Sequence, residues 1–404
     1  MVETLKPADA RGVVEAVAWA VSAKAPLELM GAGTKRALGH RVEAGHVLDL
    51  SGLSGVTDYE PEELVLIAYA GTPVAEIEGL LRQKNQQIAF EPPDFGPLFG
   101  SPAERATIAG VLAANLSGPR RIRAGAARDS FLGLQAVTGR GDLIKAGGRV
   151  VKNVTGYDVT KLVAGSYGTL CALTQVTVKV LPMPEKTRTI LVFGLDPAGA
   201  VELLGAALSS PQDVSGAAFL PATAALRSSV SFVRNAATSV AALRIEGPPA
   251  SATARTTALR DMLARHGEVE ELHSTNSVNL WREVRDVAAL LCGDMVWRLS
   301  VPPAAGGGVL AGLAADGRLE GYLDWGGGLV WLAGPADETL ADAVRTAAET
   351  SGGHATLVVA PPEMKSVVPV FHPQPAERFR LTRRIKEGFD PLGLLNPGRM
   401  YSGI

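Results

Sequence analysis

The sequence predicts a protein of the α/β or α+β class that is built from more than one domain. Its 404 residues are enough for two to three domains of about 150 residues each. Strand-like apolar runs alternate with segments of helical spacing, and the Pro-rich stretch LPMP at residues 181–184 separates two such regions. The composition, 47% hydrophobic and 20% charged, supports a large buried core and excludes a disordered or fibrous chain.

The first region opens with a predicted helix over residues 8–23, in which four valines recur at helical spacing (Val13, Val14, Val17 and Val21). Short apolar runs then predict strands over residues 27–30, 47–50 and 64–71. Pro73 fits the first position of a helix that extends to about residue 84, because the N–H that proline lacks is not needed there.

Residues 91–130 have a different character. A Pro- and Gly-rich irregular segment, EPPDFGPLFGSP, precedes a short apolar helix over residues 106–115 and a basic loop over residues 118–129. From residue 134 to residue 182 the pattern is again that of strands.

The second region, residues 187–375, predicts a β-α-β-β-α-β arrangement, and no repeat of 20–50 residues is visible. The tail, RRIKEGFDPLGLLNPGRM, predicts a helix followed by sharp turns. Leucines and a methionine alternate with the turn residues, which indicates a segment that packs onto a core. We therefore expect domains over residues 1–184 and 185–375, with residues 376–404 returning to the first.

Charge and cysteine content exclude several classes of protein. A net charge of −2 argues against binding nucleic acid through bulk charge. The cysteines, Cys171 and Cys292, are too few for a disulfide scaffold or for a zinc or iron–sulfur site of several cysteines. The N-terminus lacks a signal-like apolar segment, and the longest uncharged stretches, residues 162–178 and 299–315, are too polar or too rich in Pro and Gly to span a membrane. We expect a soluble, cytoplasmic protein.

Three glycine-containing segments are candidate sites. Gly31-Ala32-Gly33-Thr34-Lys35 follows a predicted strand, and successive glycines let backbone N–H groups converge on a phosphate. A dinucleotide-binding Rossmann loop is one interpretation, with Asp49 near the expected distance for a ribose contact. Arg36 stands where the third glycine belongs, however, and no helix is predicted to follow. A plain turn is the other interpretation.

The second segment runs from Thr107-Ile108-Ala109-Gly110 to Asn115-Leu116-Ser117-Gly118. Thr107 can cap a helix whose exposed N–H groups favour an anion. Close packing of small residues is the structural alternative. The third segment comprises Asn153 to Asp158 and Gly165 to Leu170.

In their order, these motifs resemble FAD enzymes of the vanillyl-alcohol-oxidase (PCMH-type) fold. The runs GAGTK, TIAGVLAANLSGPRR, VVKNVTGYDVTKL, GSYGTL and FDPLGLLNPGRM carry the resemblance. Within this fold the chain is similar to the FAD-binding E subunits of bacterial glycolate oxidase, also called glycolate dehydrogenase. The resemblance covers residues 25–185 and the C-terminus, and it is weak over residues 190–375.

The resemblance implies an α+β chain with a two-lobed FAD-binding domain, a second α+β domain with an antiparallel sheet, and a C-terminal segment that returns to the FAD domain. The implied cofactor-binding residues are Gly31, Ala32, Gly33, Thr34, Lys35, Thr107, Ile108, Ala109, Gly110, Asn115, Ser117, Gly118 and Gly168. Ala109, Tyr167 and Cys171 depart from the pattern of the wider fold. His40 is the one histidine near GAGTK, and nothing in the sequence directs it to the flavin, so we expect non-covalent FAD.

The resemblance also implies an assembly that oxidises glycolate, a small hydroxy acid, to glyoxylate and passes electrons to a membrane acceptor instead of NAD. The implied partners are a larger FAD-containing subunit and an iron–sulfur subunit, and they would place the chain at the inner face of the cytoplasmic membrane. Two alternatives stay open: a stand-alone FAD oxidoreductase for a hydroxy acid or alditol, and an assembly subunit whose FAD is structural.

Two further clusters have competing interpretations. His266 and His273 are seven residues apart, but His266 looks like a helix end, so we expect no metal site. Arg120, Arg121, Arg123 and Arg128 can bind a substrate carboxylate, FAD phosphates or a partner subunit, or form a solvated loop. No catalytic residue can be assigned from the sequence.

Overall fold

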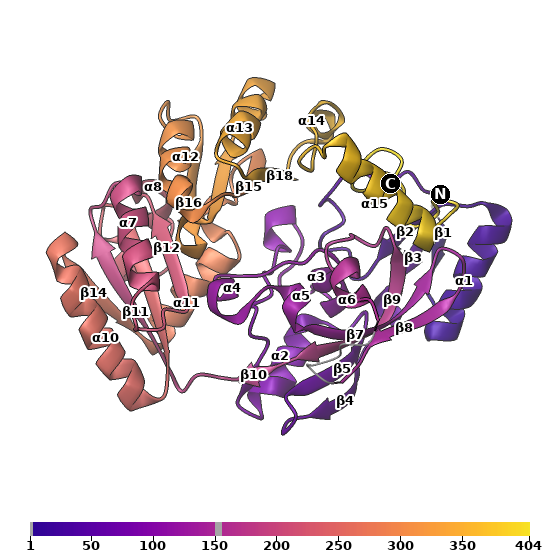
Figure 1. Cartoon of the computed structure of the whole chain (residues 1–404), viewed down its shortest axis with the longest axis horizontal. Helices are drawn as coiled ribbons and strands as arrows, with labels where there is room; N and C mark the ends of the chain where they lie inside the picture. Colours follow the sequence, from indigo (N-terminus) through magenta and orange to yellow (C-terminus); the bar gives the residue numbers. More distant parts are fainter. Residues whose placement is uncertain (1–2, 150–155) are drawn as a thin grey trace. The chain divides into compact units, whose positions relative to one another are not determined.

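The computed structural model describes residues 3–149 and 156–404 (Figure 1). These residues form two compact units. The first unit contains residues 3–117, 125–149, 156–183 and 373–404, and the second contains residues 118–124 and 184–372. The short segment 118–124 therefore belongs to the second unit although the residues on both sides of it belong to the first.

In its described residues, the first unit has two main sheets. Strands β1 (Glu3–Leu5), β3 (His46–Asp49) and β2 (Leu27–Met30) form a parallel sheet in that order. An antiparallel sheet has the order β4 (Val56–Glu60), β5 (Val65–Tyr69), β9 (Cys171–Lys179), β7 (Phe131–Thr138) and β8 (Leu143–Gly147). Strand β6 (Gln86–Gln87) pairs with β10 (Leu181–Pro182).

Helix α1 (Ala10–Ala23) shows how the sequence forms these elements. The Asp9 carboxylate accepts a hydrogen bond from the Gly12 N–H and so starts the helix, and Lys24 ends it in a left-handed conformation. Its buried face packs in one apolar cluster with β2, β3 and the C-terminal residues Leu394 and Leu395.

The remaining helices of the first unit are α2 (Val74–Arg82), α3 (Ile108–Ala113), α5 (Ala127–Ser130), α6 (Val159–Val163) and α15 (Ala376–Phe389). Two local predictions are wrong. Pro73 is the N-cap of α2, with φ −59° and ψ 136°, and does not occupy its first helical position. The predicted basic loop contains α5 and, in the second unit, the short helix α4 (Arg121–Ala124).

The C-terminal segment packs onto the first unit. The Leu27 N–H donates to the Leu394 carbonyl, and the Asn396 N–H donates to the Leu27 carbonyl. In α15 the buried Lys386 ammonium donates to the Asp390 carboxylate and to the Thr169 carbonyl, each at 2.7 Å. The predicted return of the tail is therefore part of the fold.

The second unit consists of two consecutive β-α-β-β-α-β motifs. The first contains β11 (Lys186–Phe193), α7 (Pro197–Leu208), β12 (Gly216–Leu220), β13 (Val240–Gly247), α10 (Pro249–Leu263) and β14 (Val269–His273). The second contains β15 (Met295–Ser300), α12 (Gly306–Leu313), β16 (Glu320–Asp324), β17 (Leu329–Gly334), α13 (Glu338–Thr350) and β18 (His354–Val359). Helices α8 (Ala222–Ala225) and α9 (Ser231–Arg234) lie in the connection between β12 and β13 of the first motif, α11 (Ser274–Arg285) follows the first motif, and α14 (Pro362–Val367) follows the second.

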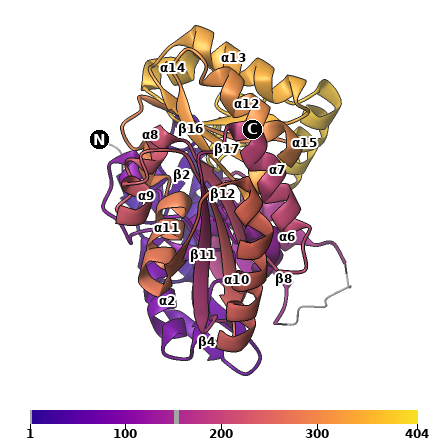
Figure 2. The same cartoon turned by 90° about the vertical axis from the view of Figure 1, so that its left-hand side faces the viewer.

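The two motifs share one antiparallel sheet in the order β14-β11-β13-β12-β16-β17-β15-β18, joined where β12 pairs with β16. The single motif predicted from the sequence is thus present twice. Both faces of the sheet are covered around β11, which lies between α10 and α11 in Figure 2. The α11 residue Trp281 is buried and donates its indole N–H to the Thr189 hydroxyl of β11 at 2.8 Å.

Candidate functional site

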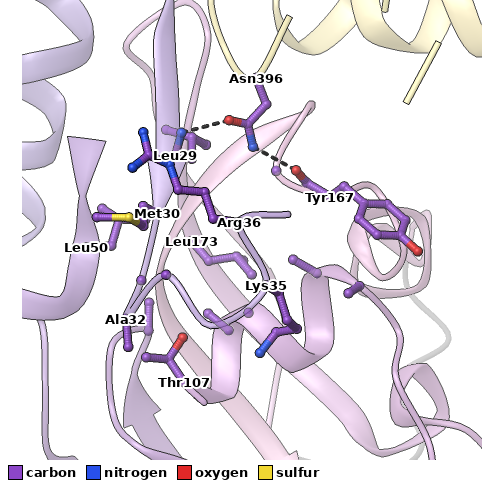
Figure 3. Close-up of a pocket in the computed structure, with 18 of the residues that line it drawn as sticks. Leu29, Met30, Ala32, Lys35, Arg36, Leu50, Thr107, Tyr167, Leu173 and Asn396 are labelled. Atoms are coloured by element: carbon purple, nitrogen blue, oxygen red, sulfur yellow. Dashed lines mark hydrogen bonds between the residues drawn. The ribbon is translucent and has the colours of Figure 1, made fainter. Parts of the chain in front are cut away.

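A pocket in the first unit collects most of the residues singled out by the sequence (Figure 3). It encloses about 810 Å³ free of protein atoms, part of it open to solvent. Most of the lining comes from four segments: the end of β2 with the loop that follows, α3 with its two flanking residues, residues 167–173, and the C-terminal turn; Leu50 and Ala70 complete it. The predicted residues in the lining are Gly31, Ala32, Gly33, Thr34, Lys35, Thr107, Ala109, Gly110 and Gly168.

The loop after β2 leaves backbone donors available. Among the described residues, no hydrogen bond engages the N–H groups of Ala32, Gly33, Thr34 and Lys35. Gly31 lies so close to α3 that a Cβ there would be 2.5 Å from the Thr107 hydroxyl. Turns follow the loop in place of a helix, which rules out the Rossmann interpretation. A loop of this kind can hold a phosphate through its backbone.

Lys35 brings a positive charge to this lining. Its ammonium donates to the Thr34 hydroxyl at 3.2 Å, and its Cε lies 3.5 Å from the position of a Cβ at Gly110. Burial lowers the pKa of Lys35 from 10.5 to about 8, and the charge of Asp94 acts in the opposite direction. The amine can therefore change its charge in the mildly alkaline range.

Two arginines and one buried glutamate stabilise the outer side of the loop. Arg36 forms a two-pronged ion pair with Glu28, with 2.7 Å between Arg36 Nε and Glu28 Oε1. Arg399 donates to the Lys35 carbonyl at 2.9 Å and lies 3.8 Å from Glu28. Burial lowers the pKa of Arg399, while the charge of Glu28 raises it. Arg36 and Arg399 both line the pocket, so the lining has a cationic character.

Helix α3 presents small residues to the pocket. Thr107 is its N-cap, but the Thr107 side chain makes no capping hydrogen bond. Ala109 and Gly110 line the pocket, whereas Ile108 is fully buried in the core. The small side chains of Ala109 and Gly110 thus permit both a close approach of α3 to the glycine loop and an open lining.

Asn115, Ser117 and Gly118 are not part of this lining. The Asn115 and Ser117 side chains accept hydrogen bonds from the backbone N–H groups of residues 128 and 127 and so fix the start of α5. The Gly118 carbonyl accepts the indole N–H of Trp325 at 3.1 Å inside the second unit. Their contact with a cofactor stays a prediction.

Asn396 joins three parts of the site and was missed in the sequence. Its side chain accepts from the Leu29 N–H at 2.7 Å and donates to the Tyr167 carbonyl at 2.8 Å (Figure 3). Gly168, at φ 74°, lies so close that a Cβ would be 2.7 Å from the Asn396 amide nitrogen. The motif NPGR signalled a turn, but only the fold shows that Asn396 and Arg399 reach the pocket.

The remaining candidates are accounted for as follows. Residues 153–155 lie outside the described residues, and Asp158 caps α6 by accepting from the Lys161 N–H. Cys171 lines the pocket, and burial raises its pKa to about 12, so it stays a neutral thiol. His40 does not line the pocket.

The basic cluster is used mainly inside the second unit. Arg120 forms a two-pronged, mostly buried ion pair with Glu246, and Arg123 pairs with Asp213. The Arg121 guanidinium lies 4.3 Å from the ring centre of Trp325. Burial raises the pKa of Glu246, but the charges of Arg244 and Arg120 outweigh this and lower it to about 2.

Neither metal binding nor membrane spanning is supported by the described residues. His273 lies 3.5 Å from Glu271 and His266 contacts Arg265, and no group of three or more potential metal ligands occurs in the part of the chain described. Nor does any helix there combine the length and apolar character needed to cross a bilayer.

Comparisons with known proteins define the class. The family model described as "FAD binding domain" matches residues 4–147. The chain can be superposed on p-cresol methylhydroxylase with a TM-score of 0.69 at 14% identity, covering 98% of this chain and 88% of that one. The protein is therefore an FAD-binding α+β protein of the PCMH-type fold.

The family is shown by a relative that matches this chain over nearly its full length. The chain is 33% identical over 396 residues to the glycolate oxidase subunit GlcE of Escherichia coli, covering 98% of both chains, and it belongs to that family. It is also 31% identical over 201 residues to the glycolate oxidase subunit GlcD of Bacillus subtilis, covering 50% of this chain and 40% of that protein.

The pocket fits FAD by its own chemistry. Four backbone N–H groups without partners in the described residues, together with Lys35 and Arg399, suit an anionic pyrophosphate. The glycines in the lining have no side chain, so a ligand can approach the backbone there. Leu29, Leu50 and Leu173 add an apolar surface that suits a flavin ring system.

Proposed function

We propose that this chain is the FAD-carrying subunit of a multi-subunit enzyme that oxidises glycolate to glyoxylate and passes electrons to an acceptor other than NAD. The observation that carries the proposal is the 33% sequence identity to GlcE, which extends over 98% of both chains. The likeness to GlcD supports a larger, related flavoprotein as a partner. In this proposal a third subunit carries the iron–sulfur clusters, and the two cysteines of this chain, too few for a cluster that usually needs four, are compatible with that division of roles. Through its partners the complex would sit at the inner face of the cytoplasmic membrane.

The residues of this chain would bind and orient the cofactor. Bound FAD supplies the two-electron acceptor. The loop Gly31–Lys35 and Arg399 would hold the pyrophosphate, and Thr107, Ala109, Gly110 and Gly168 would shape the lining along the cofactor. We propose that FAD is held without a covalent bond, since Cys171 is a buried neutral thiol and His40 lies outside the lining.

The experiment is turnover of the assembled enzyme. This chain is expressed with its GlcD-type and iron–sulfur partners, and glycolate-dependent reduction of a dye is compared with that of the isolated chain. We expect glyoxylate from the complex, FAD in this chain, and no turnover by the chain alone. A complex that forms but does not oxidise glycolate contradicts the proposal, and turnover by the isolated chain supports a stand-alone oxidoreductase for a hydroxy acid or alditol.

One observation favours a second candidate, an assembly subunit with structural FAD. Among the described residues, the pocket lining has no His, Asp or Glu that could accept the proton of a substrate hydroxyl. Bulky replacements of Gly31 and Gly33 separate the two candidates. If FAD is lost from this chain while the complex keeps its activity, the structural role is correct.

A further inference from the structure

Helix α15 carries the densest group of exposed positive charge that we find in the described residues. Its sequence RFRLTRRIK, residues 378–386, contains no acidic residue. Four arginine side chains on it are exposed: Arg378, Arg380, Arg383 and Arg384. The whole chain has a net charge of −2, so this concentration on one helix is a local feature and not a general property of the surface.

These four arginines do not serve the fold. In the described part of the chain none of them forms an ion pair, and the one contact found is between the Arg383 guanidinium and the Phe379 ring, 5.2 Å from its centre. Some exposed arginines elsewhere do form ion pairs, since Arg11 pairs with Glu15 and Arg318 pairs with Asp316. Like charges at spacings of three and four residues destabilise a helix slightly. The cluster thus slightly lowers the stability of the helix, and no ion pair within the described residues offsets this loss.

The helix beneath the cluster is firmly fixed. Lys386, in the last turn of the helix, is buried and donates to Asp390 at 2.7 Å and to the Leu395 carbonyl at 2.9 Å. At the end of the helix, the Arg140 side chain donates to the Gly388 carbonyl and adds another exposed cation. The arginines therefore stand on a preformed surface, which lowers the entropy lost when a partner binds.

The composition of the face indicates what it binds. It contains arginine and no exposed lysine, and guanidinium groups bind carboxylates in a bidentate, oriented way. Leu381, 58% exposed, stands among them, and arginine with a neighbouring apolar residue is typical of protein interfaces. One large apolar residue is too little for a helix that inserts into a membrane surface. Acidic residues at both ends, Glu377 and Glu387, also suit a protein surface better than an anionic lipid layer.

We propose that the exposed face of α15 is the docking surface for an acidic face of another subunit, the GlcD-type flavoprotein of the complex. This inference rests on the proposed function, which requires such a partner. It assigns the contact to Arg380 and Arg384, which are four residues apart and therefore adjacent on the helix surface.

The test uses the full chain with an affinity tag, co-expressed with the GlcD-type subunit from the same source. The variant is Arg380→Glu with Arg384→Glu. The matched control, Arg260→Glu with Arg265→Glu, makes the same change of charge on two exposed residues, one in the last turn of α10 and one in the turn that follows it. The FAD content of each purified chain reports folding. We expect the α15 variant to weaken capture of the GlcD-type subunit by about ten-fold or more, the control to leave it unchanged, and wild-type capture to weaken as salt is raised.

Each other outcome overturns the proposal in a distinguishable way. Equal capture by the α15 variant and the control removes α15 from the interface. Sedimentation of the wild-type chain with vesicles of phosphatidylglycerol and phosphatidylcholine, lost in the α15 variant while capture is retained, assigns the arginines to lipid. If the wild-type chain captures no GlcD-type subunit, the proposed complex is wrong, and α15 is then not a docking surface for that subunit.

Discussion

The two units of this chain use their residues in opposite ways. In the first unit, small residues and backbone shape the pocket, since Gly31, Gly110 and Gly168 line it without side chains. In the second unit, large side chains fill the interior, and Trp281, Trp297 and Tyr322 are almost completely buried. The comparison teaches that a cofactor pocket leaves a strong local motif in the sequence, whereas a packed sheet needs only a repeating pattern of elements.

The largest expected effect comes from removing the C-terminal turn, residues 388–404. The deletion leaves the buried Lys386 without Asp390 and removes Asn396 and Arg399 from the pocket. An unpaired buried charge costs about 3–5 kcal/mol, so we expect the melting temperature to fall by about 10 °C or more and FAD to be lost with it. Full flavin content at an unchanged melting temperature, measured by absorbance and calorimetry, would refute the packing of this tail.

In the second unit, Glu246→Gln should lower the free energy of unfolding by about 3 kcal/mol, because Arg120 and Arg244 lose their buried counter-charge. The pKa of Glu246 is lowered from 4.5 to about 2, so its contribution is present above pH 4.5 and is lost as the pH falls through 2. Urea unfolding at several pH values measures both effects. Glu270→Gln is the control because Glu270 is an exposed residue of β14, and a loss of stability for Glu246→Gln that only equals that of the control contradicts the account.

Gly31→Ala tests whether the pocket of the first unit needs a glycine at this position. The added Cβ would meet the Thr107 hydroxyl at 2.5 Å, and we expect FAD affinity to fall by about ten- to a hundred-fold. Gly308→Ala in α12 is the matched control, because no atom lies within 4 Å of its Cβ position. Titration of the apoproteins with FAD measures the difference. Similar affinity in both variants would mean that the approach of the glycine loop to α3 is not required.

The smallest effect concerns the charge of Lys35. With a pKa of about 8, the amine is protonated below pH 8 and loses its proton above it. A cation favours the pyrophosphate, so FAD affinity should be constant at lower pH and fall by about ten-fold or less as the pH rises past 8. The FAD affinity of Lys35→Arg should not change over this pH range. Lys35→Gln should bind FAD more weakly, and its affinity should also be independent of pH. An affinity of the wild-type chain that is independent of pH excludes the contact.

The sequence predicted much of the first unit because its features are local. Strand 27–30 and the glycine loop follow from neighbouring residues, and the alternation of turn residues with leucines predicted that the tail packs onto a core. Asn396 and Arg399 could not be identified as site residues, because their role depends on contacts with Leu29 and Lys35, more than 360 positions away.

The second unit was predicted less well for a physical reason. Its two β-α-β-β-α-β motifs share topology, which requires only apolar patterning, so their sequences need not repeat. The engagement of Arg120 with Glu246 is likewise a long-range contact between a loop-like segment and β13. Both the shared sheet and this ion pair depend on contacts between residues that are far apart in the sequence.

The most direct test of the account is the flavin content of the purified chain. We predict a yellow protein with about one FAD per chain, which acid precipitation releases into the supernatant because no covalent bond holds it. The Gly31→Ala variant purified in parallel should contain less. A wild-type chain that is colourless and takes up no FAD on reconstitution would contradict the assignment of the pocket, and flavin that stays with the precipitate would contradict non-covalent binding.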